Sequence, residues 1–258
     1  MQKEYALVTG AGRGLGKCYT EELAKRGMNI ILVGLHLDEL DEVASELRSE
    51  FGIETAQIQC DLSIKDEIVT MAKEVNSKYA VSTLINNAGL GGSKKYVDAD
   101  VDYVNQIIQV NVMGTALVTH QLLPNLLKQP KGYILNVSSI AAYSPMGFKT
   151  VYPASKAFID HFSHGLRQEL AETNVFVGEI HPGPMPTSEE RTERMNKQGA
   201  FAKLALLTPE TVAEVSIRKL FQRKSSIILN WANWLNLMLM RVFPKKAITK
   251  LVKKELES

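Results

Sequence analysis

The sequence predicts an α/β fold in which a doubly wound parallel sheet of about seven strands carries helices on both faces. Short apolar runs alternate with longer stretches of helical periodicity along the 258 residues. The runs are almost continuously apolar, as is typical of strands that are covered on both sides. Strands joined by helical crossovers pair in parallel. With 45% hydrophobic and 22% charged residues and no linker-like segment, we expect residues 1–258 to form one domain.

The expected elements follow one another in alternating order. Strands are expected at residues 5–9, 29–33, 55–60, 83–85, 133–137, 175–180 and 226–229. Helices are expected at residues 15–26, 38–51, 63–77, 101–128 and 152–172. Gly27 and Gly52 stop the first two helices, Asp38 caps the second and Ser63 caps the third. Two segments differ from this pattern: a proline-rich substrate loop at about 184–207 and a helical tail at about 230–258.

Charge and cysteine content exclude several classes of function. Lys+Arg 30 and Asp+Glu 28 leave a net charge of +2, so no strong field attracts nucleic acid. Cys18 and Cys60 are too few for a disulfide framework and lack metal-site spacing, so we expect no metal and a reducing, cytoplasmic location. The first residues run straight into glycines, so we expect no signal peptide. No stretch reaches the ~20 uninterrupted apolar residues of a membrane-spanning helix.

A glycine cluster lies between the first expected strand and the first expected helix. Residues 9–16 read TGAGRGLG. Gly10, Gly14 and Gly16 would let the backbone turn tightly and approach a pyrophosphate closely, with Gly12 as an additional glycine. The start of the following helix would offer unpaired N–H groups to the same anion. Leu15 stands where a plain G-x-G-x-x-G would need its third glycine, and a turn that binds nothing is the alternative interpretation.

Five motifs resemble those of the classical short-chain dehydrogenase/reductase family, in the family's order and spacing. They are TGAGRGLG at Thr9, CDL at Cys60, NNAG at Asn86, the asparagine of NVMG at Asn111, and the pair Ser138-Ser139 followed by YPASK at Tyr152. The resemblance covers nearly the whole chain and is weakest after about Leu220. It implies a Rossmann-type fold and an NAD(P)-dependent oxidoreductase that moves a hydride between nicotinamide and a carbonyl or secondary alcohol.

The resemblance implies a catalytic set of Asn111, Ser139, Tyr152 and Lys156. Tyr152 and Lys156 are four residues apart on a helix, so both face the same side. An ammonium beside a phenol lowers the phenol pKa from ~10, so Tyr152 can act as general acid or base. Ser139 would hydrogen-bond the substrate oxygen, and Asn111 would hold a water that links Lys156 to solvent. Taken singly, each residue also fits an ordinary structural role, and the family spacing is what favours catalysis.

The same resemblance implies a cofactor site. Asp61 would accept a hydrogen bond from the adenine amino group, although a carboxylate at a helix start is the alternative interpretation. The asparagine–alanine–glycine turn after the fourth strand would line the adenosine ribose, and the segment around Pro182 would contact the nicotinamide carboxamide. The complete set is Gly10, Gly12, Arg13, Gly14, Leu15, Gly16, Leu35, Asp61, Leu62, Asn87, Ala88, Gly89, Tyr152, Lys156, Pro182, Gly183 and Thr187.

The region after the second strand bears on the choice between NAD(H) and NADP(H). It reads VGLHLDEL, with Leu35 or His36 where an acidic residue would accept from the ribose hydroxyls of NAD. An arginine for a 2′-phosphate is also missing there. Arg13 in the glycine loop suits a phosphate, and His36 could assist it. With no carboxylate to repel a 2′-phosphate, we expect NADP(H) to be favoured over NAD(H), although Arg13 as a solvated loop residue is the alternative.

The substrate side is less specific. Apolar candidates for its lining are Tyr143, Met146, Phe148 and Met185, together with the loop at residues 89–94, which suggests a hydrophobic alcohol or ketone. The tail carries an apolar stripe with Trp231 and Trp234, followed by lysines. A packed C-terminal helix is favoured there over a substrate-entrance cap and over membrane contact. The overall pattern weakly resembles the hydroxysteroid dehydrogenase and long-chain 3-ketoacyl reductase branch.

Two rival functions stay open at this point. A non-catalytic dinucleotide-sensing regulator could use the same fold, although such a protein need not keep all four catalytic residues. Epimerase or dehydratase chemistry on a related fold would normally need a longer substrate domain. The family resemblance also implies a homodimer or homotetramer formed through the long helices at residues 101–128 and 152–172.

Overall fold

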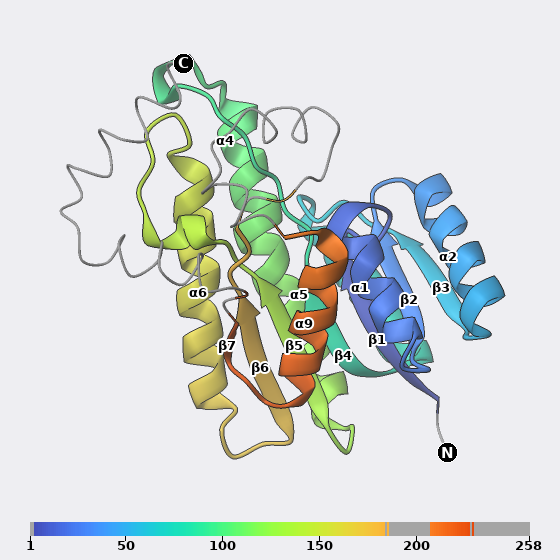
Figure 1. Ribbon diagram of the computed structural model, residues 1–258. Helices are drawn as coiled ribbons and strands as arrows, with labels where there is room; N and C mark the ends of the chain where they lie inside the picture. Colours follow the sequence, from blue (N-terminus) through green and yellow to red (C-terminus); the bar gives the residue numbers. More distant parts are fainter. Residues whose placement is uncertain (1–2, 184, 186–206, 228, 230–258) are drawn as a thin grey trace.

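The computed structural model describes residues 3–183, 185, 207–227 and 229, and the structural statements below refer to these residues. Its centre is a seven-stranded parallel sheet in the order β3-β2-β1-β4-β5-β6-β7 (Figure 1). The strands are β1 (Glu4–Thr9), β2 (Asn29–Gly34), β3 (Thr55–Gln59), β4 (Ala80–Asn86), β5 (Gly132–Val137), β6 (Val175–Ile180) and β7 (Ser226–Ile227). The expected doubly wound parallel sheet is confirmed.

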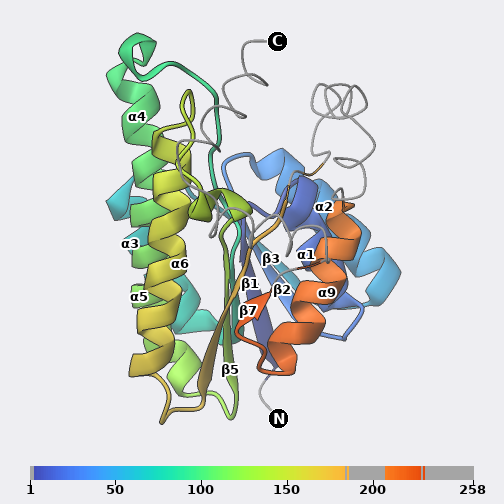
Figure 2. The same ribbon diagram turned by 60° about the vertical axis from the view of Figure 1, so that its left-hand side comes forward.

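The helices cover both faces of this sheet. They are α1 (Gly14–Ala24), α2 (Leu37–Phe51), α3 (Lys65–Lys78), α4 (Val101–Ile108), α5 (Thr115–Leu127), α6 (Val151–Glu169) and α9 (Pro209–Phe221). Short 3₁₀ turns η1 (Tyr96–Asp98) and η3 (Ile140–Tyr143) and a π-helical turn η2 (Gln109–Gly114) connect them. One layer holds α1, α2 and α9, and the other holds α3, α4, α5 and α6 (Figure 2).

Alternating side chains of the strands build two hydrophobic cores. In β1, Ala6 and Val8 face α1, α2 and α9, whereas Leu7 faces α3 and α5. Leu7 pairs in register with Ile31 of β2 and Leu84 of β4, and all three are fully buried. Because both faces are covered, the strands need apolar residues at nearly every position, which is why their sequences lack the alternation of a half-exposed sheet.

The chain reverses its direction of strand addition between β1 and β4. It runs from β1 outward to β2 and β3, crosses back, and then adds β4, β5, β6 and β7 on the other side of β1. In open parallel sheets a crevice for ligands forms beyond the carboxyl ends of the strands at such a reversal. The glycine loop follows β1 and the NNAG turn follows β4, so both lie at this edge.

Several expected elements differ in detail. The helix expected at 101–128 is divided into α4, η2 and α5, with the π-helical turn around Asn111. The expected cap at Ser63 is wrong: Ile64 is the N-cap of α3, and the Ser63 hydroxyl instead donates to Asp61 Oδ1 at 2.7 Å. The expected cap at Asp38 is also wrong, because α2 begins after His36 and Asp38 lies in its first turn. The substrate loop, except for its last residue and Met185, and the tail at 230–258 lie outside the described residues.

Helix α9 was not among the expected elements, although its start carries clear signals. Thr208 caps it by accepting from the Thr211 N–H at 3.3 Å, and Pro209 occupies the first turn. Its buried face includes Val212, Ile217 and Leu220, which pack into the core beside α1. Among the described residues, no helix is both long and apolar enough to cross a bilayer.

A chain of buried polar side chains fixes α6 to the sheet. Asn86 of β4 donates through Nδ2 to Asn136 Oδ1 of β5 and to Thr119 Oγ1 of α5, each at 2.8 Å. Asn136 Nδ2 donates in turn to Ser163 Oγ of α6 at 2.8 Å. All four residues are buried. Since an unsatisfied buried polar group costs free energy, these hydrogen bonds fix the distance between α6 and the carboxyl ends of β4 and β5.

We predict that Asn136→Ala lowers the free energy of unfolding by about 1–3 kcal/mol, because it leaves both Asn86 Nδ2 and Ser163 Oγ short of a partner. Urea denaturation followed by circular dichroism measures this. Asn105→Ala, at an exposed position of α4, is the matched control and should change stability much less. Equal effects of the two substitutions would contradict the structural role given to Asn136.

Candidate active site

Three elements bring the expected catalytic residues to the carboxyl edge of the sheet. Ser139 follows β5, Tyr152 and Lys156 lie in the first turns of α6, and Asn111 lies in η2. Pro153 stands in the first turn of α6, where a missing N–H costs nothing. Contacts between α6 and both η2 and η3 hold these segments together. The four residues that the sequence pattern selected therefore come from segments that pack together.

Lys156 is a buried cation at the centre of this cluster. Its side chain is 4% exposed, and Nζ donates to the Val137 carbonyl oxygen at 2.8 Å. Burial lowers the Lys156 pKa to about 8, because removal from water disfavours the charged form. Nζ lies 5.9 Å from the centre of the Tyr152 ring. An ammonium at this place can therefore give up its charge or keep it near neutral pH.

Asn111 joins the loop after β4 to α6. Its Oδ1 accepts from the Leu90 N–H at 2.7 Å, and its Nδ2 donates to the Leu90 carbonyl at 2.9 Å and to Ser155 Oγ at 2.9 Å. Ser155 Oγ in turn donates to the Tyr152 carbonyl oxygen at 2.7 Å. The amide of Asn111 thus connects the loop after β4 with the turn of helix that carries Tyr152, a link through Ser155 that the motifs did not reveal.

Gly89 explains why the NNAG turn must end in a glycine. A Cβ at this position would stand 3.3 Å from Lys156 Nζ and 3.3 Å from Asn111 Oδ1. Any side chain there would push on both polar atoms. The absence of a side chain lets the backbone of the turn approach Lys156 and Asn111 closely.

The serine pair after β5 has two different tasks. Ser138 is buried, and its hydroxyl donates to the Lys156 carbonyl oxygen at 2.9 Å, which anchors α6. Ser139 is half-buried and caps η3, because its Oγ accepts from the Ala141 N–H at 3.1 Å. Its own hydroxyl proton points toward the Pro182 carbonyl oxygen at 3.5 Å, a long and weak contact. The Ser139 hydroxyl can therefore turn to a ligand at small cost.

The glycine loop has the tight backbone that its sequence predicts. Gly10 and Gly14 have positive φ angles of 64° and 54°. A Cβ on Gly16 would stand 1.8 Å from the Gly10 carbonyl oxygen, so only glycine allows α1 to begin so close to β1. Arg13 is the N-cap of α1 and supplies no side-chain cap, so the first-turn N–H groups can receive an anion. This arrangement fits a pyrophosphate.

Asn87 and Thr9 fasten the loop after β4 to the glycine loop. Asn87 Nδ2 donates to the Thr9 carbonyl at 3.0 Å and to the Gly10 carbonyl at 3.3 Å. Thr9 Oγ1 accepts from the N–H groups of Asn87 and Ala88 at 3.0 and 3.1 Å. Their side chains thus organise the crevice between β1 and β4, where a dinucleotide would bind.

The other expected cofactor residues that the structure describes come after the carboxyl ends of β2, β3 and β6. Asp61 Oδ1 accepts from the Ser63 N–H at 2.8 Å and from its hydroxyl, so one carboxylate oxygen is engaged in a local turn. Leu62 is buried, whereas Leu35 is 49% exposed at the end of β2. Pro182 is buried and Gly183 half-buried after β6. Thr187 lies outside the described residues.

One premise about cofactor choice is wrong. The residues after the second strand indicated no carboxylate that would repel a 2′-phosphate, but Glu39 in the first turn of α2 reaches the glycine loop. Arg13 Nη1 and Glu39 Oε1 are 3.8 Å apart. The carboxylate escaped notice because it follows the end of β2 by five residues and returns to the loop only once α2 is folded.

A second group of polar residues lies close to Ser139, and the sequence motifs did not reveal it. Tyr143 of η3 contacts Asp160 Oδ1 of α6 and His181 Nε2 after β6, both at 3.1 Å. Asp160, His181 and buried Glu179 offer ligand atoms within 4.8 Å of one another, the geometry of a metal cluster. However, Arg167 donates to Glu179 Oε2 at 2.6 Å and neutralises it. Tyr143, Asp160 and His181 therefore connect η3, α6 and the end of β6 close to Ser139 and Pro182.

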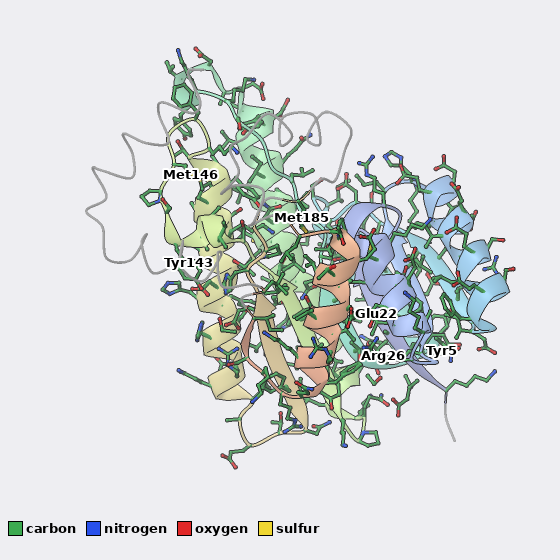
Figure 3. The ribbon with its side chains drawn as sticks, in the orientation of Figure 1. Tyr5, Glu22, Arg26, Tyr143, Met146 and Met185 are labelled. Atoms are coloured by element: carbon green, nitrogen blue, oxygen red, sulfur yellow. The ribbon has the colours of Figure 1, made fainter. Side chains whose placement is uncertain are left out.

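The apolar candidates for a substrate pocket come from two places. Tyr143 and Met146 lie on η3 and the segment that follows it, whereas Met185 lies near α9 (Figure 3). The backbone N–H of Lys94 donates to the Phe148 carbonyl at 2.6 Å, so the loop at 89–94 and the segment before α6 lie side by side. Met185 packs against the core on the α9 side.

Comparison with known proteins identifies the family of this chain. The family model described as short chain dehydrogenase matches residues 4–198. The very-long-chain 3-oxoacyl-CoA reductase of Homo sapiens is 31% identical over 259 residues, 97% of this chain and 83% of that protein. The protein of the same name from Rattus norvegicus is 37% identical over 215 residues, 80% of this chain and 68% of that protein.

Solved structures show the same similarity. A structure from a study of 7beta-hydroxysteroid dehydrogenase stereoselectivity has a TM-score of 0.87 at 25% sequence identity. The match covers 97% of this chain and 96% of that chain. A short-chain dehydrogenase from Shigella flexneri 2a, solved with NADP, has a TM-score of 0.76 at 25% identity over 87% of this chain and 95% of that chain. The chain therefore belongs to the short-chain dehydrogenase family and is an NAD(P)-dependent oxidoreductase that acts on CH–OH donors.

Proposed function

We propose that the protein interconverts a ketone and a secondary alcohol on a bulky hydrophobic substrate, with Tyr152, Lys156, Ser139 and Asn111 as its catalytic set. The observation that carries this proposal is the buried Lys156, whose pKa is lowered to about 8 and whose Nζ lies 5.9 Å from the Tyr152 ring centre. An ammonium costs free energy at such a place, and its use in tuning a neighbouring phenol accounts for it.

The roles of the side chains follow from their positions. A nicotinamide, when bound, supplies or accepts the hydride. Tyr152 gives its phenolic proton to the substrate oxygen in reduction and takes it back in oxidation. Lys156 stabilises the negative charge that the phenol bears between these states. Ser139 donates a hydrogen bond to the substrate oxygen once it releases the Pro182 carbonyl.

Asn111 acts mainly as an organiser in this proposal. Its amide is committed to Leu90 and Ser155, so a water that returns protons to Lys156 needs the remaining lone pair of Oδ1 or a backbone carbonyl. Of these two acceptors, the backbone carbonyl is favoured. Asn111 lies in a π-helical turn, where the wider turn weakens the regular backbone hydrogen bonds, and such turns are frequent at functional sites.

The cofactor site fits NADP(H) or NAD(H), and we propose that NADP(H) is favoured. Arg13 is the cation of the glycine loop and is 79% exposed at the start of α1. No acidic residue ends β2, where Leu35 stands instead. The Shigella flexneri relative that was solved with NADP also supports this choice.

Substrate class, assembly and location complete the proposal. The curated relatives named very-long-chain 3-oxoacyl-CoA reductase and the hydroxysteroid dehydrogenase structure favour a fatty-acyl or steroid ketone. Partly exposed Ile108, Met113 and Phe158 along α4, η2 and α6 favour a homodimer or homotetramer through these helices. The two free thiols, Cys18 and Cys60, favour a cytoplasmic location. We also propose that residues 1–258 form one domain. In this proposal Thr187 contacts the cofactor and the tail at 230–258 forms a packed helix.

Tyr152→Phe should lower kcat/KM by about 10²- to 10⁴-fold, because it removes the proton donor but keeps the ring. Steady-state reduction of a panel of steroid and 3-oxoacyl ketones, followed by NADPH absorbance, measures this. NADPH binding, followed by fluorescence, should persist in the variant. Unchanged turnover would contradict the role of the hydroxyl, and cofactor binding without any turnover in the wild type would favour a dinucleotide-sensing regulator.

The lowered Lys156 pKa also predicts a pH-dependent stability. Below pH 8 the folded protein must bury an ammonium, and between pH 8 and 10.5 the unfolded chain binds more protons at this residue, so stability rises with pH there. We therefore expect the free energy of unfolding of the wild type, relative to that of Lys156→Met, to increase by about 2 kcal/mol from about pH 7.5 to about pH 9.5. Urea denaturation of both proteins measures the difference. A constant difference would contradict a buried, titrating Lys156.

The cofactor preference is testable with the wild type. We expect a higher kcat/KM with NADPH than with NADH at one fixed substrate concentration and ionic strength, because Arg13 can pair with a 2′-phosphate. A strong preference for NADH would contradict this assignment.

A further inference from the structure

Glu39 is an acidic residue in contact with the glycine loop. Its Oε2 and Cβ each stand 3.0 Å from the place that a Cβ on Gly12 would occupy. Its Oε1 lies 3.8 Å from Arg13 Nη1, in an ion pair whose side chains are 79% and 36% exposed for Arg13 and Glu39. Two separate contacts therefore place the carboxylate beside the loop rather than in open solvent.

The position of Glu39 is fixed by its neighbour in the chain. Leu40 is 1% exposed, and its Cδ2 lies 3.1 Å from the place of a Gly34 Cβ and 3.6 Å from that of a Gly12 Cβ. Leu40 thus wedges the first turn of α2 between the end of β2 and the glycine loop. Because α2 cannot withdraw without opening this packing, the Cβ of Glu39 stays beside Gly12, within reach of Arg13.

The place of this ion pair matters for the adenosine end of a dinucleotide. In doubly wound folds, groups at the end of the second strand and in the neighbouring loop read the 2′ position of the ribose. Leu35 and Leu37 follow β2 here, 49% and 42% exposed, and carry no charge. Arg13 and Glu39 are charged residues in contact at the glycine loop: Arg13 attracts a 2′-phosphate, and Glu39 repels it.

We propose that Glu39 is a specificity-determining residue that pairs with Arg13 and so limits the preference for a 2′-phosphorylated dinucleotide. This inference rests on the proposed dinucleotide site. A 2′-phosphate must take the guanidinium from the Glu39 carboxylate and accept a like charge nearby. A 2′-hydroxyl meets no such competition and can donate to the same carboxylate. The protein therefore discriminates less between the two cofactors than Arg13 alone would allow.

The test uses binding of 2′,5′-ADP and of 5′-AMP, which differ at the ribose by this phosphate and need no nicotinamide or substrate. Isothermal titration calorimetry at low, fixed salt gives both Kd values. In Glu39→Gln, we expect the Kd of 2′,5′-ADP to fall by about two- to fivefold while that of 5′-AMP stays equal or rises, because one exposed ion pair is lost. Glu39→Ala should shift the ratio of the two Kd values in the same direction. This variant separates the loss of the carboxylate from any effect of the glutamine amide.

Two controls separate the pair from the general charge of the protein. Asp41→Asn removes the same charge from an exposed position of α2 and should leave the ratio of the two Kd values unchanged. In the background of Arg13→Gln, which should weaken 2′,5′-ADP, Glu39→Gln should shift the ratio less than it does in the wild type.

The outcomes are distinct. A ratio that does not change in Glu39→Gln or Glu39→Ala, or that changes equally in Asp41→Asn, would overturn the role of Glu39 while leaving the dinucleotide site in place. If the wild type binds none of 2′,5′-ADP, 5′-AMP, NADPH and NADH, the proposed cofactor site and this inference are both overturned.

Discussion

The buried ammonium of Lys156 is the constraint on which the rest of the site depends. A cation at 4% exposure is expensive to keep, and the fold offers it a backbone carbonyl oxygen, that of Val137, at 2.8 Å. The Ser138 hydroxyl binds the Lys156 carbonyl oxygen, and the backbone of Gly89 lies close to Nζ. The surrounding elements thus hold one charge near a tyrosine, where it can bias the transfer of a proton.

Precise placement of that charge requires a rigid connection between α6 and the sheet. The buried series Asn86, Asn136 and Ser163 supplies it within the core, and the Asn111–Ser155 hydrogen bond supplies it at the carboxyl edge. Both connections use short polar side chains with few rotatable bonds, which lose little entropy when they are fixed. The sheet and the first turns of α6 therefore behave as one unit, to which a cofactor and a substrate can be added.

Much of the fold and the catalytic set could be predicted because their signals are local or tied to fixed spacing. The strands read directly as apolar runs, and Tyr152 and Lys156 share a helix face by their separation alone. The contacts that the sequence did not reveal join residues far apart in the chain. Tyr143, Asp160 and His181 meet only when η3, α6 and β6 pack together. Glu39 reaches Gly12 only when α2 folds back onto β2. Periodicity carries no information on such returns.

An NMR titration of the Tyr152 phenol, with ¹³C at the ring carbon that bears the hydroxyl, tests most directly whether Lys156 tunes Tyr152. The signal is assigned by its loss in Tyr152→Phe. In the presence of cofactor, we expect a phenol pKa below the ordinary ~10 in the wild type and a clear rise in Lys156→Met. An equal Tyr152 pKa in the two proteins would contradict the claim that the buried lysine tunes the tyrosine.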